Sequence, residues 1–308
     1  MNPEKKPVLG IFGSFQNGKS TLVNGLLDGR WAATGQGLAT TRVVTRYRFG
    51  HFDQATAFAD GVAHPMDDLG VLHESQRLTQ AGIDLQPERG DRVEVETWRP
   101  LLEHLDIWDT PGVDHDQRDD HTAREALKQV DFALVVVLNH ALAQVDQKLL
   151  RWCSESLVPF AVIVNCKSGG LDRADPRDQG NQPVYGAISA ILKNGGHRPE
   201  PIGDREDGIW PCNLLWAAES LGHLAEEGRE GGEAGAAGRE KRRLVRNAFG
   251  DSMPNRSDLL RRSRIMAIRT MLSAYVHRPL NATGDNHSQQ LHQTWQAAML
   301  GCLQQGAK

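Results

Sequence analysis

The side chains best suited to chemistry form one run near the N-terminus, Gly13-Ser14-Phe15-Gln16-Asn17-Gly18-Lys19-Ser20, followed by Thr21. The run matches the pattern G-x-x-x-x-G-K-[ST]. Its two glycines let the backbone turn tightly and present N–H groups to phosphate oxygens, and the dipole of a helix beginning at Lys19 would point at the same oxygens. We expect Lys19 to reach the β- and γ-phosphates of a nucleotide and the Ser20 hydroxyl to bind Mg²⁺. The motif predicts that residues 13–21 bind a nucleoside triphosphate.

A second motif, Asp109-Thr110-Pro111-Gly112, follows the strand-like segment 105–108. We expect Asp109 to hold Mg²⁺ through a water molecule and the amide of Gly112 to meet the γ-phosphate. On its own, this sequence could be an ordinary turn. After a phosphate-binding loop, it is typical of the segment that senses the γ-phosphate.

The two motifs together resemble those of translation-factor-like GTPases, and the segment between them narrows the resemblance. Residues 38–45 resemble switch I of dynamin-like GTPases, where a Thr-Thr or Val-Thr pair precedes a strand. Phe15 and the run 22–27 are similar to bacterial dynamin-like proteins. The resemblance implies that Thr41 binds Mg²⁺, with Thr40 as the alternative, and that two G domains associate as a homodimer or heterodimer. We expect no long stalk and no helix before the loop.

The motif that reads the base departs from the family pattern [NT]-K-x-D. The sequence here is Asn165-Cys166-Lys167-Ser168. Asn165 and Lys167 are the candidates for nucleotide binding, but the acidic residue that would pair with guanine is missing in either frame. Asp172 or Asp175 could replace it. We therefore expect weaker discrimination between GTP and ATP than in enzymes that keep the acid.

The residues for hydrolysis are also unusual. Val113 follows Gly112 where Ras-like enzymes place a glutamine, and valine cannot orient water. The resemblance implies that the loop supplies the missing help, and Gln16 and Asn17 could bond water or coordinate a monovalent cation such as K⁺. The alternative is that both side chains lie on the loop and take no part in hydrolysis. With Lys19 and Thr41, they make up the expected catalytic set.

Apolar runs alternate with helical patterns along the first 230 residues. Strands are expected at 8–12, 43–49, 55–59, 93–95, 105–108, 131–138, 160–164 and 209–215. Helices are expected from residue 19 and at about 119–129, 143–157, 184–193 and 217–228. This order predicts an α/β fold, namely a P-loop GTPase domain with a mostly parallel central sheet, plus a C-terminal helical extension.

The composition of the sequence changes after residue 227, where a glycine-rich stretch is followed by a basic one. Residues 228–240 read as a Gly-rich linker that divides a G domain (1–227) from a basic helical part (241–308). Within that part, residues 258–277 have apolar positions at helical spacing and should pack on the G domain. Residues 287–306 carry an apolar stripe and no charged side chain, so we expect a helix that docks on the G domain or on a second chain.

Composition limits the class of protein. Lys and Arg number 35 against 39 Asp and Glu, a net charge of −4, which argues against nucleic-acid binding. No apolar run approaches the ~18 residues of a transmembrane helix, and the N-terminus lacks a secretory signal. The four scattered cysteines suit reduced thiols in the cytoplasm. The basic stretch 239–278 is expected to be a solvated helical surface, with contact to an anionic partner or peripheral contact with a membrane surface as the alternative.

These observations favour a Mg²⁺-dependent GTPase of the dynamin-like type that cycles between GTP and GDP. Three alternatives stay open. One is a nucleotide-binding scaffold subunit of a heteromeric complex with little turnover, which Val113 and the incomplete base motif support. Another is an ATPase or a broad-specificity NTPase. The third is a membrane-remodelling protein, which the short chain argues against.

Overall fold

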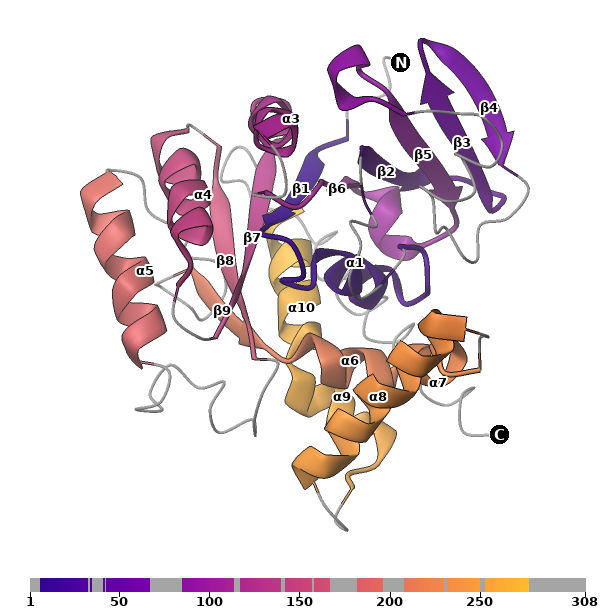
Figure 1. Cartoon of the computed structure of the whole chain (residues 1–308), viewed down its shortest axis with the longest axis vertical. Helices are drawn as coiled ribbons and strands as arrows, with labels where there is room; N and C mark the ends of the chain where they lie inside the picture. Colours follow the sequence, from indigo (N-terminus) through magenta and orange to yellow (C-terminus); the bar gives the residue numbers. More distant parts are fainter. Residues whose placement is uncertain are drawn as a thin grey trace, which may run out of the picture.

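The computed structural model has one mixed sheet with helices on both faces (Figure 1). It describes residues 6–32, 34, 41, 43–66, 85–113, 117–139, 142–156, 158–166, 182–195, 208–229, 232–249 and 253–276. Within these ranges, the strands run in the order β4-β3-β5-β2-β6-β1-β7-β8-β9. The predicted α/β fold with a mostly parallel sheet is confirmed.

The strands are β1 (Val8–Gly13), β2 (Val44–Phe49), β3 (Gln54–Ala59), β4 (Val62–Met66), β5 (Arg92–Thr97), β6 (Asp106–Asp109), β7 (Phe132–Leu138), β8 (Phe160–Asn165) and β9 (Ile209–Cys212). From β6 to β9 all neighbours are parallel, and β1 lies centrally between β6 and β7. Strands β1, β7 and β8 are buried almost throughout, as expected for parallel strands covered on both faces. Because β1 and its neighbours are parallel, their carboxyl ends meet at one edge, where the site lies.

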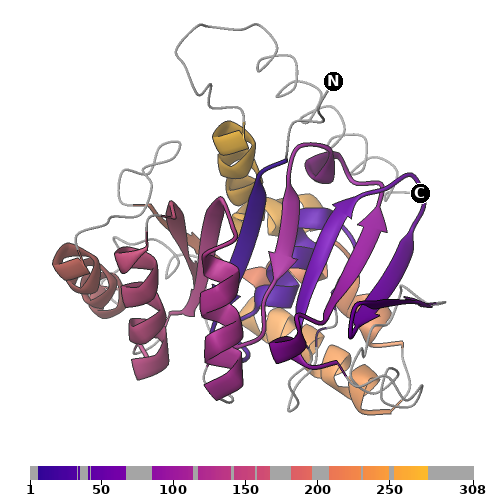
Figure 2. The same ribbon diagram turned by 90° about the horizontal axis from the view of Figure 1, so that it is seen from above.

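The helices are α1 (Lys19–Leu27), α3 (Gln117–Leu127), α4 (Gln144–Glu155), α5 (Gln182–Gly195), α6 (Leu214–Ser220), α7 (His223–Glu227), α8 (Gly232–Phe249), α9 (Arg256–Ser263) and α10 (Ile265–Val276), with short 3₁₀ turns η1 (Pro87–Arg89) and η2 (Pro100–Glu103). Figure 2 shows α3, α4 and α5 on one face of the sheet and α1 with α6–α10 on the other. Each face therefore has its own apolar core.

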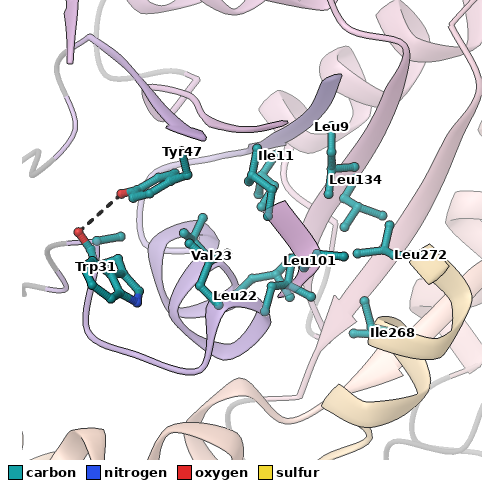
Figure 3. Packing of buried hydrophobic residues seen from close by; sticks show 14 of the residues in the cluster. Leu9, Ile11, Leu22, Val23, Trp31, Tyr47, Leu101, Leu134, Ile268 and Leu272 are labelled. Atoms are coloured by element: carbon teal, nitrogen blue, oxygen red, sulfur yellow. Dashed lines mark hydrogen bonds between the residues drawn. The ribbon is translucent and has the colours of Figure 1, made fainter. Parts of the chain in front are cut away.

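The core under α1 includes residues from the C-terminal helices. Ile268 and Leu272 of α10 lie in the same buried cluster as Leu22 of α1 and Leu134 of β7 (Figure 3). Tyr47 of β2 closes the other side of this cluster and donates from its hydroxyl to the carbonyl of Trp31 at 3.5 Å. Helix α10 is thus packed directly against the helix that follows the phosphate loop.

The prediction of a linker at 228–240 is wrong for most of that segment, because α8 begins at Gly232. Val245 of α8 is fully buried in a small cluster with Trp216 and Leu259, and the Phe249 ring packs against Trp216 in a tilted arrangement with ring centroids 4.6 Å apart. This packing overrides the low helix propensity of the glycines, which are followed by a run of good helix formers.

Two expected helices are each divided in the structure. The helix expected at 258–277 is divided, over the residues that the structure describes, into α9 and α10, which are separated at Arg264, whose φ of 62° ends the first helix. The N-cap of α9 is the Asn255 side chain, which accepts from the Asp258 amide. The segment 217–228 forms α6 and α7, separated at Gly222 with a φ of 84°.

Some regions of interest lie outside the described residues, including the expected docking helix at 287–306. In the described part of the chain, no helix is long and apolar enough to cross a membrane.

Candidate nucleotide-binding site

The phosphate loop connects β1 to α1 at the carboxyl edge of the sheet. Two of its residues have left-handed backbone conformations, Gln16 with a φ of 62° and Gly18 with a φ of 101°. A Cβ at Gly18 would lie 2.7 Å from the Asn165 amide nitrogen, so the position needs glycine both for its backbone conformation and for space. The loop is thus built tightly against β8.

Lys19 is buried and lies along the loop. Its Nζ donates to the carbonyls of Gly13 and Ser14, both at 3.0 Å. The ammonium group is therefore held at the start of α1, next to the loop residues that would surround a phosphate. This is where an anion would gain from both the lysine charge and the helix N-terminus.

Three oxygen-bearing side chains converge beside the loop. The Ser20 hydroxyl donates to Oδ2 of Asp109 at 2.9 Å. Burial raises the pKa of Asp109 to about 6, while the charge of Lys19 and the hydroxyls of Ser20 and Thr41 oppose that rise. The two hydroxyls and the carboxylate come from α1, the segment before β2, and β6, which are far apart in the sequence.

The donor set of this cluster fits a hard divalent cation. Oδ1 of Asp109 is buried and has no hydrogen-bond partner in the described structure. Such an orphaned carboxylate oxygen is costly unless something binds it, and hydroxyl and carboxylate oxygens are the ligands that Mg²⁺ accepts. The described residues contain no separate group of three or more His, Cys, Asp or Glu that could hold a metal.

The DTPG segment lies directly against the phosphate loop. A Cβ at Gly112 would be 2.9 Å from the Cα of Phe15 and 3.3 Å from Nζ of Lys19, so there is no room for a side chain. The next residue, Val113, donates its amide to the Gly13 carbonyl at 3.2 Å and buries its side chain completely. Val113 is therefore a packing residue, as its lack of polar atoms suggested.

The side chain of Asn17 points into the protein. Its Nδ2 donates to the Val136 carbonyl at 2.9 Å and to Oδ1 of Asp146 at 3.0 Å, and only 3% of the residue is exposed. In this conformation, Asn17 is used to hold the loop, whereas Gln16 is exposed. Sequence reasoning missed Asp146, which lies in the first turn of α4, because no motif links it to the loop.

Asn165 is placed at the end of β8, where a base-reading residue is expected. Its Nδ2 donates to the carbonyl of Asn17 at 2.9 Å, and its Oδ1 accepts from the amide of Leu214 at 3.2 Å. Asn165 thus joins the phosphate loop to the β9–α6 connection. Thr21 lies in α1, while Thr40, Lys167, Asp172 and Asp175 lie outside the described residues.

A family comparison agrees with this geometry. The model of the dynamin family matches residues 9–167, just over half of the chain, from β1 to the end of β8. The chain belongs to the dynamin family. The resemblance inferred from the motifs is thereby confirmed, and the fold is that of a GTPase domain.

Solved structures support the fold. Two structures of an oligomerised bacterial dynamin pair, described as sensing and tethering membranes over long range, are 15% identical to this chain with a TM-score of 0.50. They cover 88% and 89% of this chain, which spans only about half of theirs (49% and 50%). A structure of Era in complex with MgGDPNP and a segment of 16S ribosomal RNA is 16% identical, with a TM-score of 0.37 over 71% of this chain and 54% of Era. No curated protein sequence matches.

Proposed function

We propose that this dynamin-family domain binds Mg·GTP at the phosphate loop and hydrolyses the β–γ phosphoanhydride to GDP and phosphate. The observation that carries the proposal is the convergence of Ser20, Thr41 and Asp109 beside Lys19. No other described part of the chain combines a phosphate-binding loop with a set of hard oxygen donors.

Each residue has a role in this scheme that follows from its position. Lys19 and the loop amides stabilise the negative charge that develops on the phosphate oxygens. Ser20, Thr41 and Asp109 would hold Mg²⁺, which neutralises phosphate charge when it is bound. Gly112 would meet the γ-phosphate with its backbone amide and couple it to the following segment, and its closeness to Phe15 leaves no room for a side chain there.

A second candidate is a nucleotide-binding scaffold with slow turnover. Val113 is buried, and the side-chain amide of Asn17 already donates hydrogen bonds to the Val136 carbonyl and to Asp146. Gln16 and Asn17 are the two loop residues expected to bind water or K⁺, and of these two Gln16 is the exposed one. Hydrolysis would then depend on Gln16, or on a group supplied by a partner.

Association with a second G domain would supply such a group. The bacterial dynamin structures of similar fold are oligomeric pairs. We propose that this domain likewise pairs with a copy of itself or a related chain, and that peripheral membrane contact and a cytoplasmic location accompany this. Guanine preference is expected to be modest, because Asn165 binds protein groups at both ends of its amide.

Measuring phosphate release by the purified chain tests this function. We expect Mg²⁺-dependent release from GTP that rises more than linearly with protein concentration, is faster in K⁺ than in Na⁺, and is lost in Gln16→Ala. Tight GTP binding with no release at any protein concentration would favour the scaffold. Equal release from ATP and GTP would favour a broad-specificity NTPase.

A further inference from the structure

The carboxylate of Asp146 is buried at the start of α4 and bonded to the phosphate loop. One oxygen, Oδ1, accepts from the Ser14 hydroxyl and from Nδ2 of Asn17. Only 2% of Asp146 is exposed. A buried carboxylate is costly to desolvate unless it accepts hydrogen bonds, and here the loop supplies two of them.

The two donors lie on either side of the strained part of the loop. Between Ser14 and Asn17 the chain makes a tight turn, in which the Asn17 amide donates to the Ser14 carbonyl at 3.3 Å. Gln16 within this turn has a left-handed φ of 62°, which is unfavourable for a residue with a Cβ. By accepting from both ends, Asp146 holds the turn closed and offsets the strain.

We propose that Asp146 is a positioning residue for the nucleotide site: it holds the phosphate loop in the binding conformation before the ligand arrives. Preorganising a loop in this way raises affinity, because the loop loses its conformational entropy when the protein folds and not when the nucleotide binds. The inference rests on the proposed nucleotide-binding function, and it assigns to this site a residue 129 positions away from Asn17 in the sequence.

The position of Asp146 also connects the loop to α3, the helix that follows the DTPG segment. Lys148 of α4 forms an ion pair with Asp120 of α3. The guanidinium of Arg124 in α3 lies 4.0 Å from the ring centroid of Trp152 in α4. Helix α4 is therefore braced against α3 while its first turn holds the phosphate loop.

The test compares Asp146→Ala with Asp146→Asn in the full chain. The asparagine keeps an oxygen acceptor of the same shape, whereas alanine removes it. Affinity for Mg·GTP is measured by titration, well below the melting temperature of each variant. We expect Asp146→Ala to weaken binding about tenfold or more, and Asp146→Asn to stay within about threefold of the parent.

Equal affinities for the parent and a folded Asp146→Ala would overturn the inference. So would an Asp146→Asn variant that binds Mg·GTP as weakly as Asp146→Ala does. If Asp146→Ala does not fold, Ser14→Ala replaces it, since this change removes one of the two donors. It should weaken binding with little change in melting temperature, and unchanged binding would count against the idea. A parent that binds neither GTP nor ATP would instead contradict the proposed function.

Discussion

At the scale of single residues, the carboxyl group of Asp109 is costly to ionise because it is buried. It is buried at the end of β6, its pKa is raised to about 6, and one of its oxygens has no hydrogen-bond partner among the described residues. The ordinary pKa is 3.8. The folded protein therefore holds a proton on Asp109 more tightly than the unfolded chain does, so the stability of the fold falls as the pH rises from about 4 to about 6 and stays at the lower value above that.

Replacing Asp109 with asparagine should have two effects of opposite sign. Mg²⁺-dependent affinity for GTP should fall, because asparagine is the weaker metal ligand. The ligand-free protein should melt at a higher temperature at pH 7.5, since a rise of about 2 pKa units corresponds to at most about 3 kcal/mol. As the pH falls through 6 towards 4, the parent carboxyl becomes neutral and the difference should disappear.

Titration with GTP in Mg²⁺ and in EDTA, together with melting curves across this pH range, checks both effects. A variant that simply damages the fold would lower affinity and melting temperature together. That result would contradict the assignment of Asp109 as a metal ligand whose buried charge destabilises the protein when no metal is bound.

The positions of the loop and DTPG residues could be predicted, because they depend on spacing along the chain. The motifs predict that Lys19, Ser20 and Asp109 share one site, and in the structure Lys19 donates to a loop carbonyl while Ser20 donates to Asp109. Asp146 could not be predicted, since its bond to Ser14 joins residues 132 positions apart. The inward orientation of Asn17 has the same cause, because it depends on Val136 and Asp146 from distant elements.

At the scale of elements, the contact between α10 and α1 joins the C-terminal helices to the site. Arg269 of α10 is buried, and its Nε donates to the carbonyl of Gly25 at 2.9 Å, with a second bond from Nη2. Gly25 lies in the last turn of α1, where carbonyls lack a partner within the helix. Its missing side chain also makes room for Ile265, whose Cδ1 would be 3.2 Å from a Cβ.

Arg269→Met should therefore destabilise the protein. Methionine keeps most of the apolar stem but leaves the Gly25 carbonyl buried without its donor, which costs about 1–3 kcal/mol. Arg261→Met is the matched control, because the Arg261 side chain is 75% exposed and its ion pair with Asp258 lies at the surface. Denaturant unfolding of both variants measures the difference, and equal stabilities would show that the Arg269 contact is energetically unimportant.

Element predictions succeeded where burial and periodicity agree and failed where tertiary contacts decide. The strands β1, β7 and β8 follow directly from continuous apolar runs. Helix α8 did not, since its glycine-rich beginning looks like a linker, and the packing of Val245 and Phe249 that stabilises the helix cannot be read from the sequence. Likewise, the break at Arg264 depends on how α9 and α10 pack, which periodicity does not reveal.

At the scale of the whole molecule, the described C-terminal helices share a core with the sheet. Leu260, Ile265, Ile268, Met271 and Leu272 belong to the same buried cluster as residues of α1, β1 and β7. This cluster crosses the boundary that the sequence suggested between a G domain and a separate C-terminal part. The two parts are therefore expected to fold as one unit.

A chain that ends at residue 252 should not form a stable G domain. It would expose the apolar faces of α1 and α6 that α9 and α10 cover, and losing several fully buried Leu or Ile side chains costs about 1.5–3 kcal/mol each. Calorimetry of the full chain should show one cooperative transition. Two separate transitions, or a truncated chain that melts like the parent, would contradict this view.

The most direct test of the central claim is a calorimetric titration of the full chain with Mg·GTP, in the parent and in Lys19→Ala. We predict one site per chain and a loss of affinity of about ten- to a hundredfold in the variant, because a charge-assisted phosphate contact is worth about 1.5–3 kcal/mol. Affinity should also fall when EDTA removes Mg²⁺. A folded Lys19→Ala that binds GTP as tightly as the parent would contradict the account, as would a parent that binds no nucleoside triphosphate.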